Sequence, residues 1–189
     1  MIRRSLLLVL LVGVVGVWLV SERRRLHRVA PPAPAEEVPG RTVELPSWGN
    51  GAPPLLIDVP TSAKQERTQG PDFEVFYFAE PSGARLGIYM GHNPNSFRPA
   101  GARQEKGTIG SHQVTWECGR DTEATPAREL CETHVEGLFI PPPNQPKLPA
   151  TGGVAALVVH LWVTGDPAAL IRLRRSAESL RVKWPGPAS

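Results

Sequence analysis

The chain has 189 residues, of which 41% are hydrophobic, and this length can bury the core of one domain without bound metals or many disulfides. The formal net charge of +3 originates in residues 1–28, which hold six arginines against one acid, whereas residues 29–189 carry a net charge of −2. Because a nucleic-acid-binding domain concentrates positive charge on its folded part, we expect no nucleic-acid partner.

Residues 5–20 are the first predicted element, a run of sixteen residues without a charge. As a helix this run is about 24 Å long, slightly less than the roughly 30 Å hydrocarbon core of a bilayer. Arginines on both sides can extend to the headgroups and make up the difference. We therefore predict a membrane anchor within residues 1–28, with the lipid bilayer as the partner of residues 5–20.

A cleaved signal peptide is the competing interpretation of this segment. Arg3 and Arg4 are typical of its basic start, but the charged block SERRRLHR follows Val20, where a small-x-small cleavage site is needed. The sequence therefore favours an uncleaved, single-pass anchor. The arginines of residues 23–28 favour a cytoplasmic domain, whereas the arginine pair at the start and the cysteine pair described below favour an extracytoplasmic one, which we predict.

Residues 29–40 are rich in proline, which predicts an extended linker between the membrane and the domain. A single domain is expected over residues 41–184, followed by a short tail at residues 185–189. The loop sequence SWGNG near the start of the domain contains Trp48. Its indole is a candidate for binding a ligand or the headgroup surface, and it can equally pack over the edge of the domain.

The first half of the domain is predicted to consist of strands. Thr42–Leu45 and Leu55–Val59 have the composition of short strands, and Pro60 ends the second. Phe73–Ala79 is rich in aromatic and β-branched residues, and the turn sequence PSG separates it from Arg85–Met90. These two segments therefore predict a β-hairpin.

The segment Gly91–Gly101 is predicted to be irregular because it contains several proline, glycine and asparagine residues. It brings His92 and Asn93 to the end of a strand, and loops at strand ends often carry binding function. The same residue types are ordinary in turns, and the sequence favours that interpretation.

A second hairpin is predicted from Gln113–Cys118 and Leu130–Phe139, which flank a polar stretch. If Cys118 faces Cys131, Trp116 pairs with Thr133, and alternation places the mostly apolar residues on one face. That face holds Val114, Trp116, Cys118, Cys131, Thr133, Val135 and Phe139, and the other holds Gln113, Thr115, Glu117, Glu132, His134 and Glu136. Because this register separates the apolar residues from the polar ones, the pattern supports the pairing of Cys118 with Cys131.

The two cysteines allow three interpretations: a disulfide, a reduced pair in the core, or a zinc site formed by Cys118, Cys131 and His134. In the register above His134 points away from the cysteines, whereas zinc ligands converge. An oxidising compartment therefore favours the disulfide. It would close a loop of about 14 residues and contribute about 3 kcal/mol according to the chain-entropy treatment.

His134 is predicted to lie among three carboxylates, those of Glu117, Glu132 and Glu136. Such a group can hold a metal or supply a base. Nothing in the sequence fixes a further ligand, so a solvated sheet face is the favoured interpretation, and we predict no cofactor, no metal and no catalytic residue. His160 lies inside an apolar run and is expected to be a core residue with one hydrogen bond.

The last part of the domain predicts a central strand followed by a helix. Val154–Thr164 is almost wholly apolar, as expected of a strand covered on both faces. Asp166 suits a helix N-cap, Pro167 suits the first helical position, and Ala168–Val182 has apolar residues at helical spacing. The fold class is therefore α+β: an antiparallel sheet of about five to seven strands with a C-terminal amphipathic helix on one face, preceded by an N-terminal transmembrane helix.

This order of elements resembles the PsbP-like group of small α+β domains. The resemblance lies in the apolar strand that runs into Val59 and Pro60, the strand hairpins, and the final helix that runs into Ser179–Val182, and it covers most of residues 55–183. Members of that group are mostly non-catalytic binding or accessory modules. The resemblance therefore implies such a module here, and it carries over no functional residue.

The common catalytic motifs GxSxG, GxGxxG after a strand, P-loop and HExxH do not occur in the chain. We expect a membrane-anchored, non-catalytic accessory or binding domain, with a membrane protein as a candidate partner. One alternative is a small membrane-anchored hydrolase or metal-dependent enzyme that uses His134 or His92. Another is a structural subunit of a membrane complex, whose anchor packs closely at Gly13 and Gly16.

Overall fold

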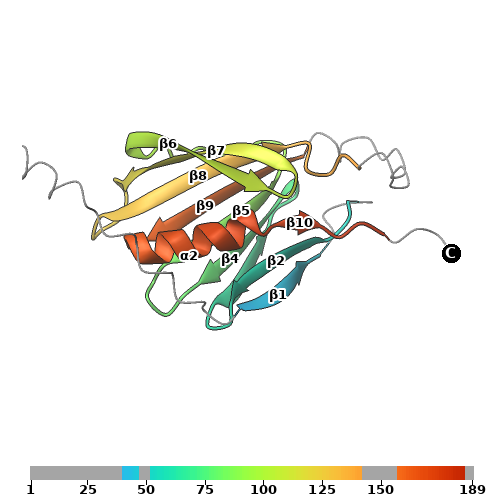
Figure 1. Ribbon diagram of the computed structural model, residues 1–189, viewed down its shortest axis with the longest axis horizontal. Coiled ribbons are helices and arrows are strands. Elements are labelled where there is room, and N and C mark those ends of the chain that lie inside the picture. Colours follow the sequence, from blue (N-terminus) through green and yellow to red (C-terminus); the bar gives the residue numbers. More distant parts are fainter. Residues whose placement is uncertain (1–39, 47–51, 142–156, 186–189) are drawn as a thin grey trace, which may run out of the picture. The chain divides into compact units, whose positions relative to one another are not determined.

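Short segments of alternating apolar and polar residues pair into two antiparallel sheets (Figure 1). The smaller sheet has the order β1-β2-β10 and consists of β1 (Gly40–Leu45), β2 (Leu55–Pro60) and β10 (Arg181–Val182). The larger sheet has the order β3-β4-β5-β9-β8-β7-β6. Its seven strands are β3 (Lys64–Gln69), β4 (Phe73–Ala79), β5 (Arg85–Gly91), β6 (Ala100–Ile109), β7 (His112–Asp121), β8 (Arg128–Glu136) and β9 (Val158–Gly165).

This computed structural model describes residues 40–46, 52–141 and 157–185. The predicted anchor at residues 5–20, most of the predicted linker and Trp48 lie outside the described residues, so the expectations for them stay predictions. In the described part of the chain, no helix has the length and apolar character needed to cross a membrane.

Helix α2 (Pro167–Glu178) begins as predicted. Asp166 is the N-cap, and its Oδ1 accepts hydrogen bonds of 2.9 Å from the N–H groups of Ala168 and Ala169. Pro167 occupies the first turn, where its missing N–H leaves no hydrogen bond unmade. The local sequence therefore determines where the helix starts.

The helix ends at Glu178, which corrects the prediction that it continues to Val182. The Ser179 hydroxyl donates to the Ser176 carbonyl at 2.6 Å, and the Asp58 N–H donates to the Ser179 hydroxyl at 2.8 Å. Arg181 and Val182 then pair with β2 as a new strand. The chain leaves the helix because Asp58 and β2, which lie more than a hundred residues earlier, supply its next hydrogen bonds.

Helix α2 packs on one face of the seven-stranded sheet, and the three-stranded sheet lies beside it (Figure 1). Both sheets and the helix contribute to a single buried cluster. Its fully buried members include Leu45, Ile57, Phe76, Phe78, Leu86, Ile88, Trp116, Leu161, Leu173 and Leu180. Each such side chain contributes about 1.5–3 kcal/mol by leaving water. The predicted α+β class, with a C-terminal helix on one face of an antiparallel sheet, is therefore confirmed.

The two edge strands of the larger sheet are the main strands that the sequence pattern missed. All six residues of β3 are exposed, and β6 is exposed along most of its length. Edge strands rich in charge discourage aggregation between chains. Since neither strand buries a full face, neither shows the apolar alternation on which the prediction depends. The smaller sheet was also not expected as a separate unit.

Candidate functional site

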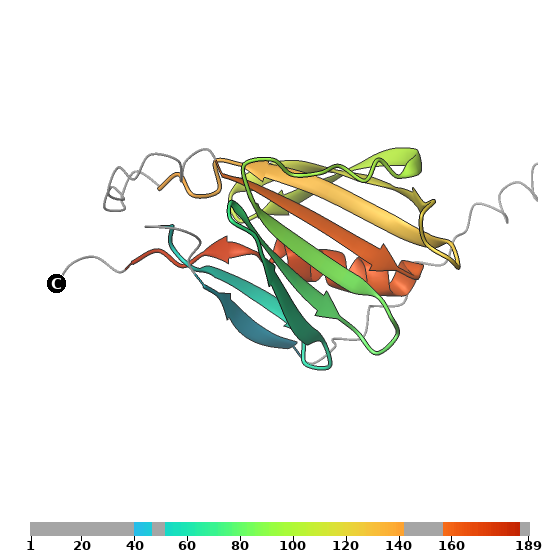
Figure 2. The ribbon, with the colours of Figure 1, turned by 180° about the vertical axis from the view of Figure 1, so that it is seen from behind.

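The face of the seven-stranded sheet opposite α2, which is turned toward the viewer in Figure 2, is called the outer face here. Directly opposed residues form rows across the strands. One row consists of Tyr77 on β4, Gly87 on β5, Trp162 on β9, Glu132 on β8, Glu117 on β7 and Gln104 on β6. The next row consists of Val75, Tyr89, His160 and His134. Aromatic rings therefore lie at one end of these rows and polar groups at the other.

The missing side chain of Gly87 explains how the Trp162 ring reaches across β5. A Cβ atom at Gly87 would lie 2.1 Å from the Trp162 ring, so only glycine leaves space for it. The indole extends over this glycine to Tyr77, with 5.8 Å between ring centroids and an edge-to-face angle of 80°.

Phe97, in the loop between β5 and β6, covers the middle of this face. Its ring centroid lies 5.2 Å from that of Trp162 and 5.5 Å from that of His160. His160 in turn stacks on His134 at 4.2 Å with 10° between the ring planes. The five rings of Tyr77, Trp162, Phe97, His160 and His134, called the aromatic row below, are thus in continuous contact, and Phe97 is 47% exposed.

Glu132 holds the Phe97 loop in place. Its side chain is only 2% exposed, and its carboxylate accepts hydrogen bonds from the Ser96 hydroxyl at 2.9 Å, the Phe97 N–H at 3.0 Å and the Arg98 N–H at 2.9 Å. Arg98 has a φ of 47°, the positive value that curls the backbone so that successive N–H groups point to one anion. These three loop residues and Glu132 are called the clasp below.

His160 completes the shell of hydrogen bonds around Glu132, with Nε2 2.9 Å from Oε2. Burial acts to raise the pKa of Glu132, but the hydrogen bonds from His160 and from the clasp outweigh it and lower the pKa to about 2. The carboxylate is therefore ionised, so it can only accept, and the hydrogen of this pair resides on His160 Nε2. His160 is 2% exposed, which confirms the expectation of a core histidine with a hydrogen bond.

The outer face departs from the solvated face that the sequence predicted. Glu132 was expected among exposed polar residues, and the clasp instead buries it completely. His134 does face away from the cysteines as predicted, and it remains exposed. Partial burial and the neighbouring His160 lower the pKa of His134, and the nearby carboxylates oppose this shift only in part.

Strands β7 and β8 diverge next to the clasp. Their backbone ladder runs from Asp121–Arg128 to Glu117–Glu132, and beyond it β7 continues its ladder with β6, while the Thr133 hydroxyl of β8 donates to the Thr115 carbonyl of β7 at 2.9 Å. The predicted pairing of Trp116 with Thr133 lies beyond this ladder. The divergence leaves a hollow of about 350 Å³, lined by Ser96, Gln113, Val114, Thr115, Glu117, Glu132, Thr133 and His134.

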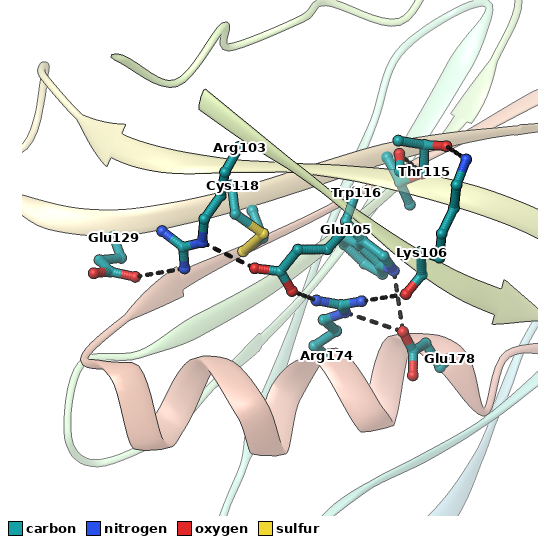
Figure 3. Close-up of a disulfide and its surroundings, with 11 residues drawn as sticks. Arg103, Glu105, Lys106, Thr115, Trp116, Cys118, Glu129, Arg174 and Glu178 are labelled. Carbon is teal, nitrogen blue, oxygen red and sulfur yellow. Dashed lines mark hydrogen bonds and ion pairs between the residues drawn. A yellow bond between two sulfur atoms is a disulfide. The ribbon is translucent and has the colours of Figure 1, made fainter. Parts of the chain in front are cut away.

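The disulfide stands next to the point of divergence (Figure 3). Cys118 and Cys131 are bonded, with a Cα–Cα distance of 4.0 Å, and both are buried on the α2 side of the sheet. The predicted disulfide is therefore confirmed, and neither a reduced pair nor a zinc site describes these cysteines. One residue further along, the ladder ends, so the disulfide fastens β7 to β8 just before they separate.

Contacts with α2 explain why β7 turns away from β8. The Trp116 indole N–H donates to Glu178 at 3.1 Å, and the Arg174 guanidinium lies 5.2 Å above the indole ring. Arg174 also donates to the Lys106 carbonyl at 2.9 Å and pairs with Glu105 (Figure 3). The β6–β7 hairpin therefore bends toward the helix, and the hollow opens on the opposite face.

The arrangement of Ser96, Glu132 and His160 differs from that of a hydrolase triad. In serine and cysteine hydrolases an imidazole stands between the nucleophile and a carboxylate, whereas here the Glu132 carboxylate stands between Ser96 and His160. With its pKa near 2, Glu132 is a weak base at neutral pH. Within residues 40–46, 52–141 and 157–185, no group of three or more His, Cys, Asp or Glu side chains is placed to hold a metal ion.

His92 and Asn93 are two further predicted site residues that the structure describes. His92 and Asn93 are exposed at the end of β5, where the Asn93 N–H donates to the Tyr89 hydroxyl at 3.3 Å, and neither is among the described residues that line the hollow. The sequence pattern missed Phe97 and Trp162. The signal available was that both alternating sets of residues in β4 and β9 contain large apolar or aromatic residues, which indicates that the outer face is partly covered.

No protein-family model and no curated protein sequence matches this chain. The resemblance to PsbP-like domains therefore stays a prediction. The function has to be inferred from the aromatic row, the clasp and the hollow.

Proposed function

We propose that this chain is a membrane-anchored, non-catalytic binding or accessory domain that engages a partner through its outer face. The observation that carries the proposal is the position of Phe97, whose exposed ring is held on the aromatic row by a clasp around one buried, ionised carboxylate. Aromatic residues are enriched at the centres of protein interfaces, where few residues supply most of the binding energy.

The clasp supports this proposal because it fixes Phe97 before any partner arrives. Hydrogen bonds to a charged group are worth about 1.5–3 kcal/mol each, and Glu132 accepts two from the loop backbone and one from Ser96. An interface residue that is already ordered loses less conformational entropy on binding. Three hydrogen bonds hold the loop that exposes the large apolar ring of Phe97 to water. Exposing such a ring does little for the stability of the fold, so partner recognition explains it more readily.

The predicted anchor and linker extend the proposal to the membrane. Twelve residues of proline-rich linker span about 35 Å when extended, so a domain on this tether acts close to the bilayer surface. The disulfide between Cys118 and Cys131 favours an oxidising, extracytoplasmic compartment. We therefore place the partner among membrane or membrane-associated proteins on that side.

Site-specific photo-cross-linking in native membranes tests the proposal. Phe97 and Ile171 are both large apolar residues, 47% and 52% exposed, and they lie on the outer face and on α2 respectively. A photoreactive phenylalanine derivative placed at position 97 should give one discrete adduct, which mass spectrometry identifies, whereas the same group at position 171 should not. Equal cross-linking from the two positions, or none from position 97, would overturn the proposal.

A further inference from the structure

We propose that the hollow between β7 and β8 receives a basic side chain, lysine or arginine, from the partner polypeptide. This inference rests on the proposed function and names the chemistry that the outer face recognises. It is carried by one uncompensated carboxylate in the hollow, by the hydrogen-bond acceptors around it and by the exposed Phe97 ring beside it.

The first step concerns charge. Glu117 stands directly opposite Glu132, and like charges at directly opposed positions of a sheet are destabilising. The Glu132 charge is stabilised by the clasp and His160, as described above. Glu117 is half-buried, and within the described part of the chain its carboxylate makes no hydrogen bond or ion pair. A cation in the hollow would therefore relieve this repulsion.

The second step concerns the surrounding groups. Thr115, Gln113 and Ser96, whose side chains carry oxygen atoms, line the same hollow as Glu117. Ammonium and guanidinium groups carry three and five N–H donors and no acceptor, so they match a lining dominated by acceptors. His134 faces the same hollow, and its lowered pKa keeps it uncharged at neutral pH.

Two further charged groups lie at the rim. The Lys106 ammonium donates to the Thr115 hydroxyl at 3.2 Å, so its hydrogen-bond partner is this hydroxyl and not a carboxylate. Glu136 lies on β8 beyond His134, is exposed and adds negative charge to the same face. The hollow therefore retains an excess of negative charge that a basic side chain complements.

The third step concerns shape. A volume of about 350 Å³ lies at the low end for ligand sites, which matches one long side chain better than a cofactor. Ser96 lines the hollow, and Phe97 follows it with an exposed ring. Aliphatic stems of lysine and arginine pack on such a ring while the charged end makes polar contacts, and a cation near the ring face gains further attraction.

The test uses the full-length protein in detergent micelles and two matched probes, N-acetyl-arginine N-methylamide and its uncharged isostere, N-acetyl-citrulline N-methylamide. Binding is followed by NMR shifts of the His134 and Trp162 ring signals. We expect the arginine probe to bind at least about tenfold more tightly than the citrulline probe. Glu117→Gln should abolish this preference. Glu123→Gln, which removes an exposed carboxylate in the loop between β7 and β8, should retain it.

Equal binding of the two probes to the unmodified protein, or an unchanged preference in Glu117→Gln, would show that the hollow does not select a basic side chain. An unchanged NMR spectrum away from β7 is the control that Glu117→Gln remains folded. These results are independent of the cross-linking at position 97. An adduct at Phe97 without an arginine preference refutes only the ligand class, whereas an arginine preference without an adduct refutes the proposed partner interaction.

Discussion

Glu132 and His160 form a buried pair on adjacent strands, with 2.9 Å between Oε2 and Nε2 and 2% of each side chain exposed. Removing one member of a buried hydrogen-bonded pair that contains a carboxylate leaves polar groups without partners and is strongly destabilising. This pair also supports the loop that carries Phe97. Stability and the position of the exposed Phe97 ring therefore depend on the same carboxylate.

The first prediction concerns Glu132→Gln, which keeps the shape of the side chain and removes its charge. The new amide group cannot accept hydrogen bonds from all of the clasp donors, so we expect a loss of about 3 kcal/mol in the free energy of unfolding. Urea denaturation measures it. The control is Glu117→Gln, which changes the residue opposite Glu132. The Glu117 carboxylate has no hydrogen-bond partner in the described part of the chain, so this variant should lose far less free energy of unfolding. Equal losses in the two variants would contradict the role given to the clasp.

The second prediction is a pH dependence of stability. The folded-state pKa of Glu132 is about 2, below the ordinary value of 4.5. A carboxyl group whose pKa is lowered by folding stabilises the fold at pH values above its unfolded-state pKa. Glu132 should therefore contribute about 3 kcal/mol to the free energy of unfolding at neutral pH, and this contribution should be lost as pH falls from about 4.5 toward 2. The stability difference between the unmodified protein and Glu132→Gln should shrink over this range. A difference that stays constant with pH would refute this assignment.

The third prediction concerns His134, whose pKa is lowered by partial burial and by the neighbouring His160. The unfolded chain binds a proton at this residue more readily than the folded chain, so His134 should destabilise the fold as pH falls below about 6.5. An NMR titration of its ring protons should give a midpoint below the ordinary value. His134→Phe should keep the stacked ring and remove this part of the pH dependence, and a midpoint above the ordinary value would contradict the prediction.

The fourth prediction concerns Gly87→Ala. The added methyl group would lie 2.1 Å from the Trp162 ring, so the ring must move away from Tyr77. We expect a cost of about 2 kcal/mol, typical of overpacking. A double-mutant cycle with Trp162→Phe provides the control, because the smaller ring should recover part of the loss. Additive costs in thermal denaturation would show that the two residues do not interact.

The fifth prediction concerns the disulfide. Its half-cystines are 13 residues apart in sequence, and a closed loop of this size is worth about 3 kcal/mol according to the chain-entropy treatment. Cys118→Ala combined with Cys131→Ala should lower the free energy of unfolding by this amount under oxidising conditions. The double variant should also be insensitive to reductant, whereas the unmodified protein should lose stability when reduced. Equal stability of the two proteins without reductant would contradict the prediction.

Features set by neighbouring residues could be predicted from the sequence. The helix start at Asp166 and Pro167 depends on a cap within one turn, and the pairing of Cys118 with Cys131 follows from alternation along one hairpin. The hairpin of β4 and β5 was likewise expected from its aromatic strand and its turn. In each case the partners lie within about 20 residues of one another.

Features set by distant partners could not be predicted. The burial of Glu132 depends on Phe97, 35 residues away, and the end of α2 depends on Asp58, 121 residues from Ser179. No local pattern reports such contacts, because alternation assigns a side chain to a face and does not say whether a loop covers it. The aromatic row was missed for this reason, although the apolar residues on both faces of β9 indicated that something covers it.

The polar margins of the seven-stranded sheet have a consequence for how a partner can approach. All six residues of β3 are exposed and most of β6 is too, with charged residues along both strands. Such margins resist the strand addition by which many domains capture extended peptides. Under the proposed function, a partner would gain little from the backbone at either margin, so its chain would lie across the strands and be selected by side chains rather than by main-chain pairing.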